Sequence, residues 1–155
     1  MISKGIRGAI TVDENSKEAL KDATLELLRE MFEQNNIYYA QNLPPHPYLT
    51  RGCNAHSSQT TTPSPTEKCC RRGDNYCIDN ISHIIFTTTN DLNAEFPAKF
   101  AREDMGLKNT AMMCFHELDV PNSLPLCLRI LIVLNCEEDF KPQFVYLKGA
   151  SNLRK

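Results

Sequence analysis

The sequence predicts an α+β fold: a mixed β-sheet of about five strands with helices packed on one face. Short runs rich in Ile, Val, Thr and Phe recur along the chain, as is typical of strands. A long amphipathic helical pattern follows the first of these runs. The late strand runs adjoin one another, which favours an α+β arrangement over strictly alternating units. With 155 residues, the chain has single-domain length and can bury a core, so residues 1–155 are expected to form one domain.

The first strand is expected at residues 5–12 and the clearest helix within residues 12–36. Apolar and small side chains recur there at the spacing of one helical face, namely Leu20, Ala23, Thr24, Leu27, Leu28 and Met31. Asn15 and Glu18 have the form of a capping box at the start of this helix. The sequence Gln-Asn-Asn at 34–36 is a plausible stop.

Residues 37–78 differ from the rest of the chain. They hold five of the nine prolines and a Ser/Thr tract, without any periodicity. Such a composition buries too little apolar surface to offset its ordering entropy, which predicts a long disordered insertion into the domain. It is interpreted as a solvated loop, a regulatory attachment, or sequence wrongly retained in a gene model.

Strand patterns return at 81–89, 109–115, 127–135 and 143–150. Between the first two of these, a turn leads into a short helix. Pro97 occupies a position that a first helical turn permits, and Gly106 follows the expected end.

Charge and composition exclude several classes of function. The net charge of −2 and the lack of a basic stripe argue against nucleic acid as a partner. The richest apolar run, at 126–134, is too short to span a bilayer and contains Arg129, so no membrane partner is expected. The first strand follows the N-terminus without a leader pattern, and the seven cysteines are an odd number, as for reduced thiols. These features predict a cytoplasmic protein.

Two arginines, Arg7 and Arg129, stand inside otherwise apolar strand patterns. A buried cation is costly unless an anion meets it, and guanidinium matches carboxylate geometry through paired hydrogen bonds. The arginines therefore indicate either a site for a compact, doubly negative molecule or a core ion pair with Glu117 or Asp119. On composition alone, the ion pair is the slightly stronger interpretation.

Cys114 and Glu117 lie where the strand pattern at 109–115 leaves the core, at a position where pockets open. His116 has no accompanying nucleophile and is interpreted as a surface side chain. A zinc site would have to draw on Cys69, Cys70, Cys77, His56 and His83. Their spacing does not match paired metal ligands, so no metal is expected. There is no Gly-rich phosphate loop and no dinucleotide fingerprint.

Five ordered segments together resemble a known family. They read GIRGAITV at 5–12, DLNAEFPAKFAR at 91–102, MMCFHELDV at 112–120, CLRILIVLN at 127–135 and VYLKGASNLR at 145–154. This set is similar to the monofunctional chorismate mutases of the AroH class. The resemblance covers about 36 residues before the insertion and nearly all of the chain from residue 79 onward, by eye.

The resemblance implies a homotrimer of small α+β subunits with active sites between neighbours. It implies conversion of chorismate to prephenate on the shikimate route to phenylalanine and tyrosine, without a cofactor. By position, Arg7 matches an arginine that binds a substrate carboxylate, and Arg129 matches the arginine placed against the ether oxygen. Glu117 matches the carboxylate that takes the ring hydroxyl, with Cys114 beside it. Tyr146 matches the tyrosine that holds the side-chain carboxylate.

The resemblance also implies that a neighbouring subunit lends one stretch of the pocket, which matches Phe96, Ala98, Lys99 and Arg102. The C-terminal tail that covers the entrance matches Leu153 and Arg154. Met113 departs from the family pattern, where a smaller or polar side chain is expected: either its backbone makes the contact or its side chain intrudes. The insertion is a second departure. A catalytically inactive trimeric homologue that binds a small acid or regulates is the alternative function, and a zinc-dependent interaction module is a weaker one.

Overall fold

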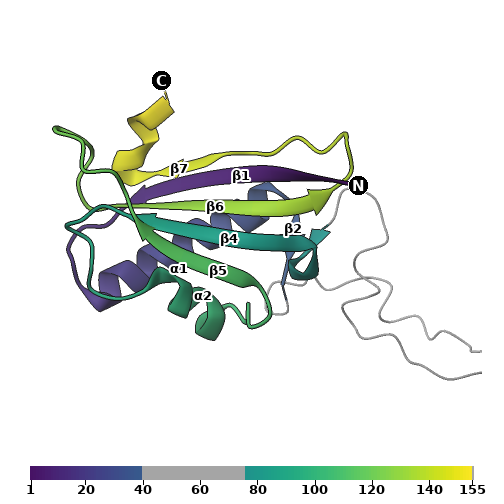
Figure 1. The fold of residues 1–155 in the computed structure, drawn as a ribbon, viewed down its shortest axis with the longest axis horizontal. Coiled ribbons are helices and arrows are strands. Elements are labelled where there is room, and N and C mark those ends of the chain that lie inside the picture. Colours follow the sequence, from purple (N-terminus) through teal and green to yellow (C-terminus); the bar gives the residue numbers. More distant parts are fainter. Residues whose placement is uncertain (40–75, 155) are drawn as a thin grey trace, which may run out of the picture.

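The structure, a computed structural model, describes residues 1–39 and 76–154 (Figure 1). A five-stranded sheet with the strand order β5-β4-β6-β1-β7 forms its centre. Its strands are β1 (Ile2–Thr11), β4 (Ile81–Thr88), β5 (Ala111–His116), β6 (Cys127–Cys136) and β7 (Val145–Leu147). The pairs β1–β6 and β4–β6 are antiparallel, whereas β4–β5 and β1–β7 are parallel. The predicted mixed five-stranded sheet is therefore confirmed.

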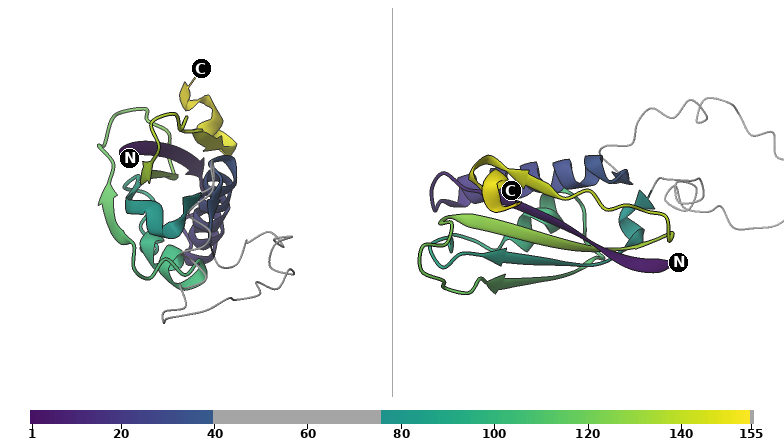
Figure 2. Two further views of the ribbon diagram at one scale, coloured as in Figure 1. Left: turned by 90° about the vertical axis from the view of Figure 1, so that its right-hand side faces the viewer. Right: turned by 90° about the horizontal axis from the view of Figure 1, so that it is seen from above.

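Both α-helices, α1 (Lys17–Gln34) and α2 (Pro97–Asp104), lie on the same side of the sheet, as predicted (Figure 2). The predicted apolar stripe of α1 is buried against it. Gly8 of β1 lies directly beneath α1, since a Cβ built there would come within 2.4 Å of the Met31 sulfur. Pro97 opens α2 at its first turn, and Gly106 follows its end with a φ of +74°.

The start of α1 differs from the prediction by one residue. Ser16, not Asn15, is the N-cap, and its hydroxyl accepts a hydrogen bond from the backbone N–H of Ala19 at 3.2 Å. The Asn15 amide oxygen instead accepts hydrogen bonds from the backbone N–H groups of Asn93 and Ala94, both at 3.0 Å. Asn15 therefore fastens the turn before α2, because a side chain of this kind caps whichever backbone groups the fold brings to it.

The predicted insertion at 37–78 is wrong at both edges. Ile37–Tyr38 and Tyr76–Cys77 form β2 and β3, a two-stranded parallel sheet, and η1 (Ile78–Asn80) leads from it into β4. Ile37 is buried, and the Tyr76 ring packs edge-to-face on Phe140. Two-residue strands carry no periodic signal, so tertiary packing alone defines them. The rest of the predicted insertion, at 40–75, lies outside the described residues, as do His56, Cys69 and Cys70 of the zinc alternative.

The last predicted strand, at 143–150, is shorter in the structure. Only Val145–Leu147 pairs with β1, and Lys148 then turns the chain with a φ of +50° into the 3-10 helix η2 (Lys148–Arg154). The Thr11 hydroxyl accepts a hydrogen bond from the backbone N–H of Gly149 at 2.9 Å. This contact fixes the start of η2 at the end of β1.

The face of the sheet turned away from α1 and α2 is called the open face below. It displays alternate residues of the strands, among them Arg7, Ile85, Thr87, Met113, Phe115, Arg129, Leu131 and Val133. These side chains are half-buried or exposed, whereas their strand neighbours on the helix side are mostly buried.

No helix in the described part of the chain combines the length and apolar character that crossing a bilayer requires. Cys114, Cys127 and Cys136 are free thiols, but Cys77 takes part in a disulfide, which departs from the expectation of reduced cysteines.

Candidate active site

The strand register places two transverse rows of side chains on the open face. They lie toward the end of the sheet where β1, β4 and β5 finish (Figure 1). The first row runs Tyr146, Ala9, Arg129, Thr87 and Phe115. The second runs Arg7, Leu131, Ile85 and Met113. Arg7 and Arg129 are therefore diagonal neighbours on paired strands, a relation in which Cβ atoms are typically somewhat less than about 7–8 Å apart. The residue between Tyr146 and Arg129 is the small Ala9, whose side chain protrudes less than theirs.

Arg129 is only loosely paired. Its Nε lies 3.6 Å from Oε1 of Glu117, and 43% of its side chain is exposed. That nitrogen is itself buried, yet it has no hydrogen-bond partner in the described residues. The predicted internal ion pair with Glu117 is thus present, but as a single contact longer than a hydrogen bond. The guanidinium is not held by the bidentate geometry that would occupy it fully.

Arg7 has no carboxylate within 4 Å in the described part of the chain. Its guanidinium lies over the Phe144 ring, 4.6 Å from the ring centroid. A cation–π contact of this kind orients an arginine without neutralising its charge. The open face therefore presents an oriented positive group that pairs with no anion among the described residues.

Glu117 follows the last residue of β5, where the sheet gives way to an exposed loop. Its backbone N–H donates to the carbonyl of Thr88 at 2.9 Å, which extends the pairing with β4 by one residue. Its side chain is 21% exposed and lies between Arg129 and Thr87, whose hydroxyl donates to Oε1. The prediction of a residue at a strand exit is therefore confirmed for Glu117, whereas Cys114 lies within β5 and packs toward the core.

Tyr146 and the C-terminal tail border the first row on its β7 side. Tyr146 packs against a small buried cluster of Ala9, Cys127 and Ala150. Leu153 in η2 is 39% exposed, so this apolar side chain is displayed near the end of the tail. Arg154 also belongs to η2.

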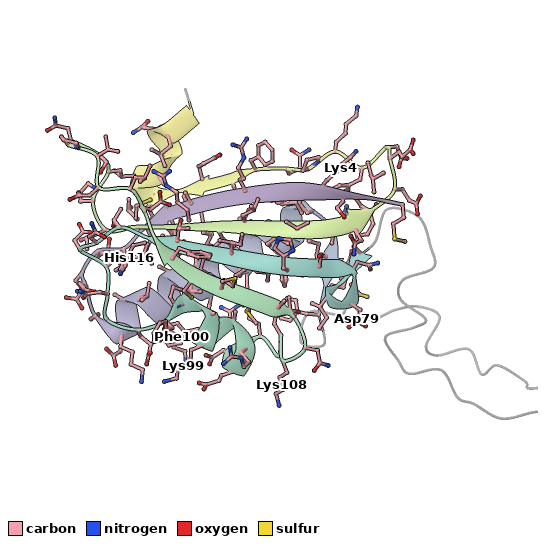
Figure 3. All side chains as sticks on the ribbon, in the orientation of Figure 1. Lys4, Asp79, Lys99, Phe100, Lys108 and His116 are labelled. Carbon is pink, nitrogen blue, oxygen red and sulfur yellow. The ribbon has the colours of Figure 1, made fainter. Side chains whose placement is uncertain are left out.

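The remaining predicted residues lie elsewhere. Figure 3 shows Lys99 on α2, on the helix side of the sheet, where its ammonium group pairs with Glu95 at 2.9 Å. Phe96 precedes the same helix and is 67% exposed, Ala98 is buried, and Arg102 is exposed. None of these residues takes part in either row of the open face.

Cys114 and Met113 are neighbours on β5 that face opposite sides of the sheet. Met113 is 59% exposed on the open face, so its side chain is displayed rather than tucked into the core. The Cys114 side chain packs toward the core. Burial raises the pKa of this thiol, and a hydrogen bond donated by the backbone of Ala98 and the charge of Arg102 partly oppose the rise. Cys114 therefore belongs with the residues of α2 and not with Arg129.

Cys127 is a buried thiol two residues before Arg129 on the open-face side of β6. Burial raises its pKa, and the positive charge of Arg129 partly opposes this rise. The thiol is therefore neutral at neutral pH. The charged groups beside it are those of Arg129 and Glu117.

The geometry divides the predicted residues into two groups. Arg7, Arg129, Glu117 and Tyr146 form one group on the open face, and Phe96, Ala98, Lys99, Arg102 and Cys114 form another around α2. Met113 sits in the same row as Arg7 but three strand spacings away, about 14 Å. A single-ring ligand in contact with Arg7 and Arg129 cannot also reach α2 of the same copy.

Thr87 is the contact of Glu117 that the sequence reasoning missed. It stands next to Arg129 in the first row, and its hydroxyl contacts the carboxylate. The available signal was the strand alternation at 81–89, which places Thr87 on one face with Ile85. It could not show that this face is the one that carries Arg129.

Comparisons with known proteins identify the family of the chain. The family model "Chorismate mutase type I" matches residues 3–43 and 68–155. Chorismate mutase AroH from Thermus thermophilus is 32% identical over 152 residues, covering 97% of this chain and 93% of the relative. Chorismate mutase AroH from Bacillus subtilis is 25% identical over 155 residues, covering 99% and 91%. A chorismate mutase structure from Clostridium thermocellum superposes with a TM-score of 0.67 at 34% identity, covering 95% and 96% of the two chains. The chain therefore belongs to the type I chorismate mutases, a family of isomerases.

Proposed function

We propose that this chorismate mutase binds chorismate on the open face and rearranges it to prephenate with Arg129, Arg7 and Glu117 as its main site residues. The observation that carries the proposal is the pair of neighbouring arginines, of which one is loosely paired and the other has no carboxylate partner in the described residues. Two fixed cations beside one carboxylate are complementary to a ligand with two carboxylates and a hydroxyl.

The chemistry needs few groups. The conversion is a one-step intramolecular rearrangement, in which a C–O bond breaks as a C–C bond forms. No nucleophile or proton shuttle takes part. The enzyme must hold the flexible substrate with its reacting carbons close together. As the C–O bond stretches, negative charge gathers on the ether oxygen. A fixed cation there stabilises the transition state more than the ground state, and this difference accelerates the reaction.

Each residue of the open face has one proposed task. Arg129 meets the ether oxygen, and Arg7 binds a substrate carboxylate. Glu117 accepts a hydrogen bond from the ring hydroxyl, and Tyr146 holds the carboxylate of the substrate's side chain. The position of Arg129 beside Glu117 supports this division, because the ether oxygen and the ring hydroxyl are on neighbouring carbons of the substrate and would meet these two groups side by side.

We also propose that the site is completed by a second copy of the chain in a homotrimer. The neighbour supplies Phe96, Ala98, Lys99 and Arg102 around α2, and Leu153 and Arg154 of the tail cover the entrance. The separation of the two groups within one copy supports this arrangement. The apolar open face supports it further, since Ile85, Met113, Phe115, Leu131 and Val133 are displayed there without a cover from α1 or α2.

The contributions of Met113 and Cys114 are proposed to differ. Cys114 lines the pocket from the side of α2, beside Ala98. Met113, with its displayed side chain, contacts the substrate through its backbone. We also propose that residues 1–155 form a single domain. A cytoplasmic location stays a prediction.

The direct experiment is to follow the decay of chorismate absorbance with the purified full-length chain, together with its mass in solution. Turnover that saturates with chorismate, in a particle of three chains, supports the proposal. Decay no faster than in buffer would contradict it. Tight chorismate binding without turnover would instead support the inactive homologue, which no feature of the described site favours.

A further inference from the structure

Thr87 is the residue that fixes the carboxylate of Glu117 from the sheet side. Its hydroxyl donates to Oε1 of Glu117, and the two residues come from different strands. A hydrogen bond to an ionised carboxylate is among the stronger contacts a hydroxyl can make. The contact therefore ties a side chain at the start of a loop to a residue inside the sheet.

Without this hydrogen bond, the side chain of Glu117 would be free to rotate about its torsions. Glu117 begins a loop whose next apolar side chains, Leu118 and Val120, are 85% and 54% exposed. Its backbone is pinned by the N–H bond to the Thr88 carbonyl, but this leaves three side-chain torsions unrestrained. Thr87 restrains them, because its β-branched side chain is stiff and its backbone is paired on both sides.

Both contacts of the carboxylate fall on the same oxygen. Thr87 donates to Oε1, and the 3.6 Å approach of Arg129 is to Oε1 as well. The other oxygen, Oε2, accepts no hydrogen bond from the described residues. One oxygen is thus held by the protein and the second is presented to a ligand.

We propose that Thr87 is a positioning residue of the active site: it holds Oε1 of Glu117 so that Oε2 meets the substrate's ring hydroxyl. This inference rests on the role proposed above for Glu117 and names the group that orients it. Thr87 itself touches no substrate.

Thr87→Val tests the inference, because valine keeps the shape and β-branching of threonine but removes the donor. Loss of one hydrogen bond to a charged group predicts that kcat/KM falls about 10- to 100-fold. Thr87→Ser keeps the donor and is expected to stay within about threefold of the wild type. Thr24→Val is the matched control: it removes a hydroxyl that donates one hydrogen bond within α1, to the Leu20 carbonyl, away from the open face, and it is expected to leave activity unchanged.

A double-mutant cycle separates positioning from a structural role. Glu117→Ala removes the carboxylate, so Thr87→Val in that background is expected to cause no further loss. A second 10- to 100-fold loss there would overturn the inference, because Thr87 would then act independently of Glu117. If Thr87→Val fails to fold, Thr87→Ala replaces it in the same cycle.

The outcomes distinguish this inference from the proposed function. Wild-type activity of Thr87→Val, with a Glu117→Ala protein whose kcat/KM is lowered but measurable, overturns the role of Thr87 alone. Wild-type activity of Glu117→Ala overturns the role of Glu117 and with it this inference. A loss in Thr87→Val that serine rescues and that vanishes in the Glu117→Ala background supports both.

Discussion

Replacing Arg129 by alanine is the perturbation that bears most on the proposed chemistry. A unit charge about 3 Å from the developing oxyanion, at an effective dielectric constant of about 20, contributes about 5 kcal/mol. Part of that stabilisation is already present in the ground state, so we take about 4 kcal/mol as the loss, in line with removal of one oxyanion donor. Each 1.36 kcal/mol is about one decade, so kcat is expected to fall about 1000-fold.

The same variant is expected to fold normally. The Arg129 side chain is 43% exposed, and its one ion-pair contact is 3.6 Å long. Such a pair contributes at most about 1 kcal/mol to the free energy of unfolding. Removing Arg129 also removes a buried nitrogen without a hydrogen-bond partner in the described residues, which offsets part of that loss.

The assay measures chorismate decay for the wild type, for Arg129→Ala and for the matched control Arg29→Ala, which removes an exposed arginine of α1. Thermal unfolding and mass in solution are measured for all three. The control is expected to behave as the wild type in every measurement. A folded, trimeric Arg129→Ala protein that keeps kcat within about tenfold of the wild type would refute the electrostatic reasoning.

Three further predictions concern stability and the insertion. Gly106→Ala is expected to lower the free energy of unfolding by about 1 kcal/mol, because its φ is +74°, and Gly106→Asn by less; urea denaturation measures both. The Thr89 hydroxyl and, more weakly, the backbone N–H of Leu126 lower the pKa of Asp91. The ionised Asp91 carboxylate therefore stabilises the folded protein above the ordinary aspartate pKa, and this stabilisation is lost as the pH falls through the lowered pKa. Asp91→Asn, which has no carboxylate to protonate, is therefore expected to lose less stability than the wild type between about pH 6 and about pH 3, and an equal loss would contradict this. Replacing residues 44–67, which lie between the two matched segments of the family model, by a short linker is expected to leave kcat/KM within about threefold of the wild type, since closing a loop depends only weakly on its length.

Periodicity predicted the elements that bury one face. The stripe from Leu20 to Met31 is the buried face of α1, and the alternation at 127–135 places Arg129 opposite the core side of β6. These features depend on local spacing, which the sequence carries directly. The short strands β2 and β3 depend on a contact between distant segments, so no local pattern indicates them.

The site was predictable residue by residue but not as an arrangement. Arg7 and Arg129 could be recognised as unusual cations in strands, and the family resemblance could assign them roles. The register that places Ala9 opposite Arg129, and Thr87 on its other side, is set by the pairing of three strands. Pairing between strands that are distant in the sequence cannot be read from either segment alone, which is why Thr87 was missed.

The central claim is that Arg7 and Arg129 of one copy work with α2 of another. Co-expression of Arg129→Ala and Arg102→Ala chains with different tags tests it most directly, after each variant alone is found inactive. In randomly mixed trimers, about one quarter of the sites receive an intact open face from one copy and an intact α2 from the next. The account predicts that the mixed trimers regain about one quarter of the wild-type activity, whereas mixing Arg129→Ala with Arg7→Ala regains none. Mixed Arg129→Ala and Arg102→Ala trimers as inactive as their parents would contradict it.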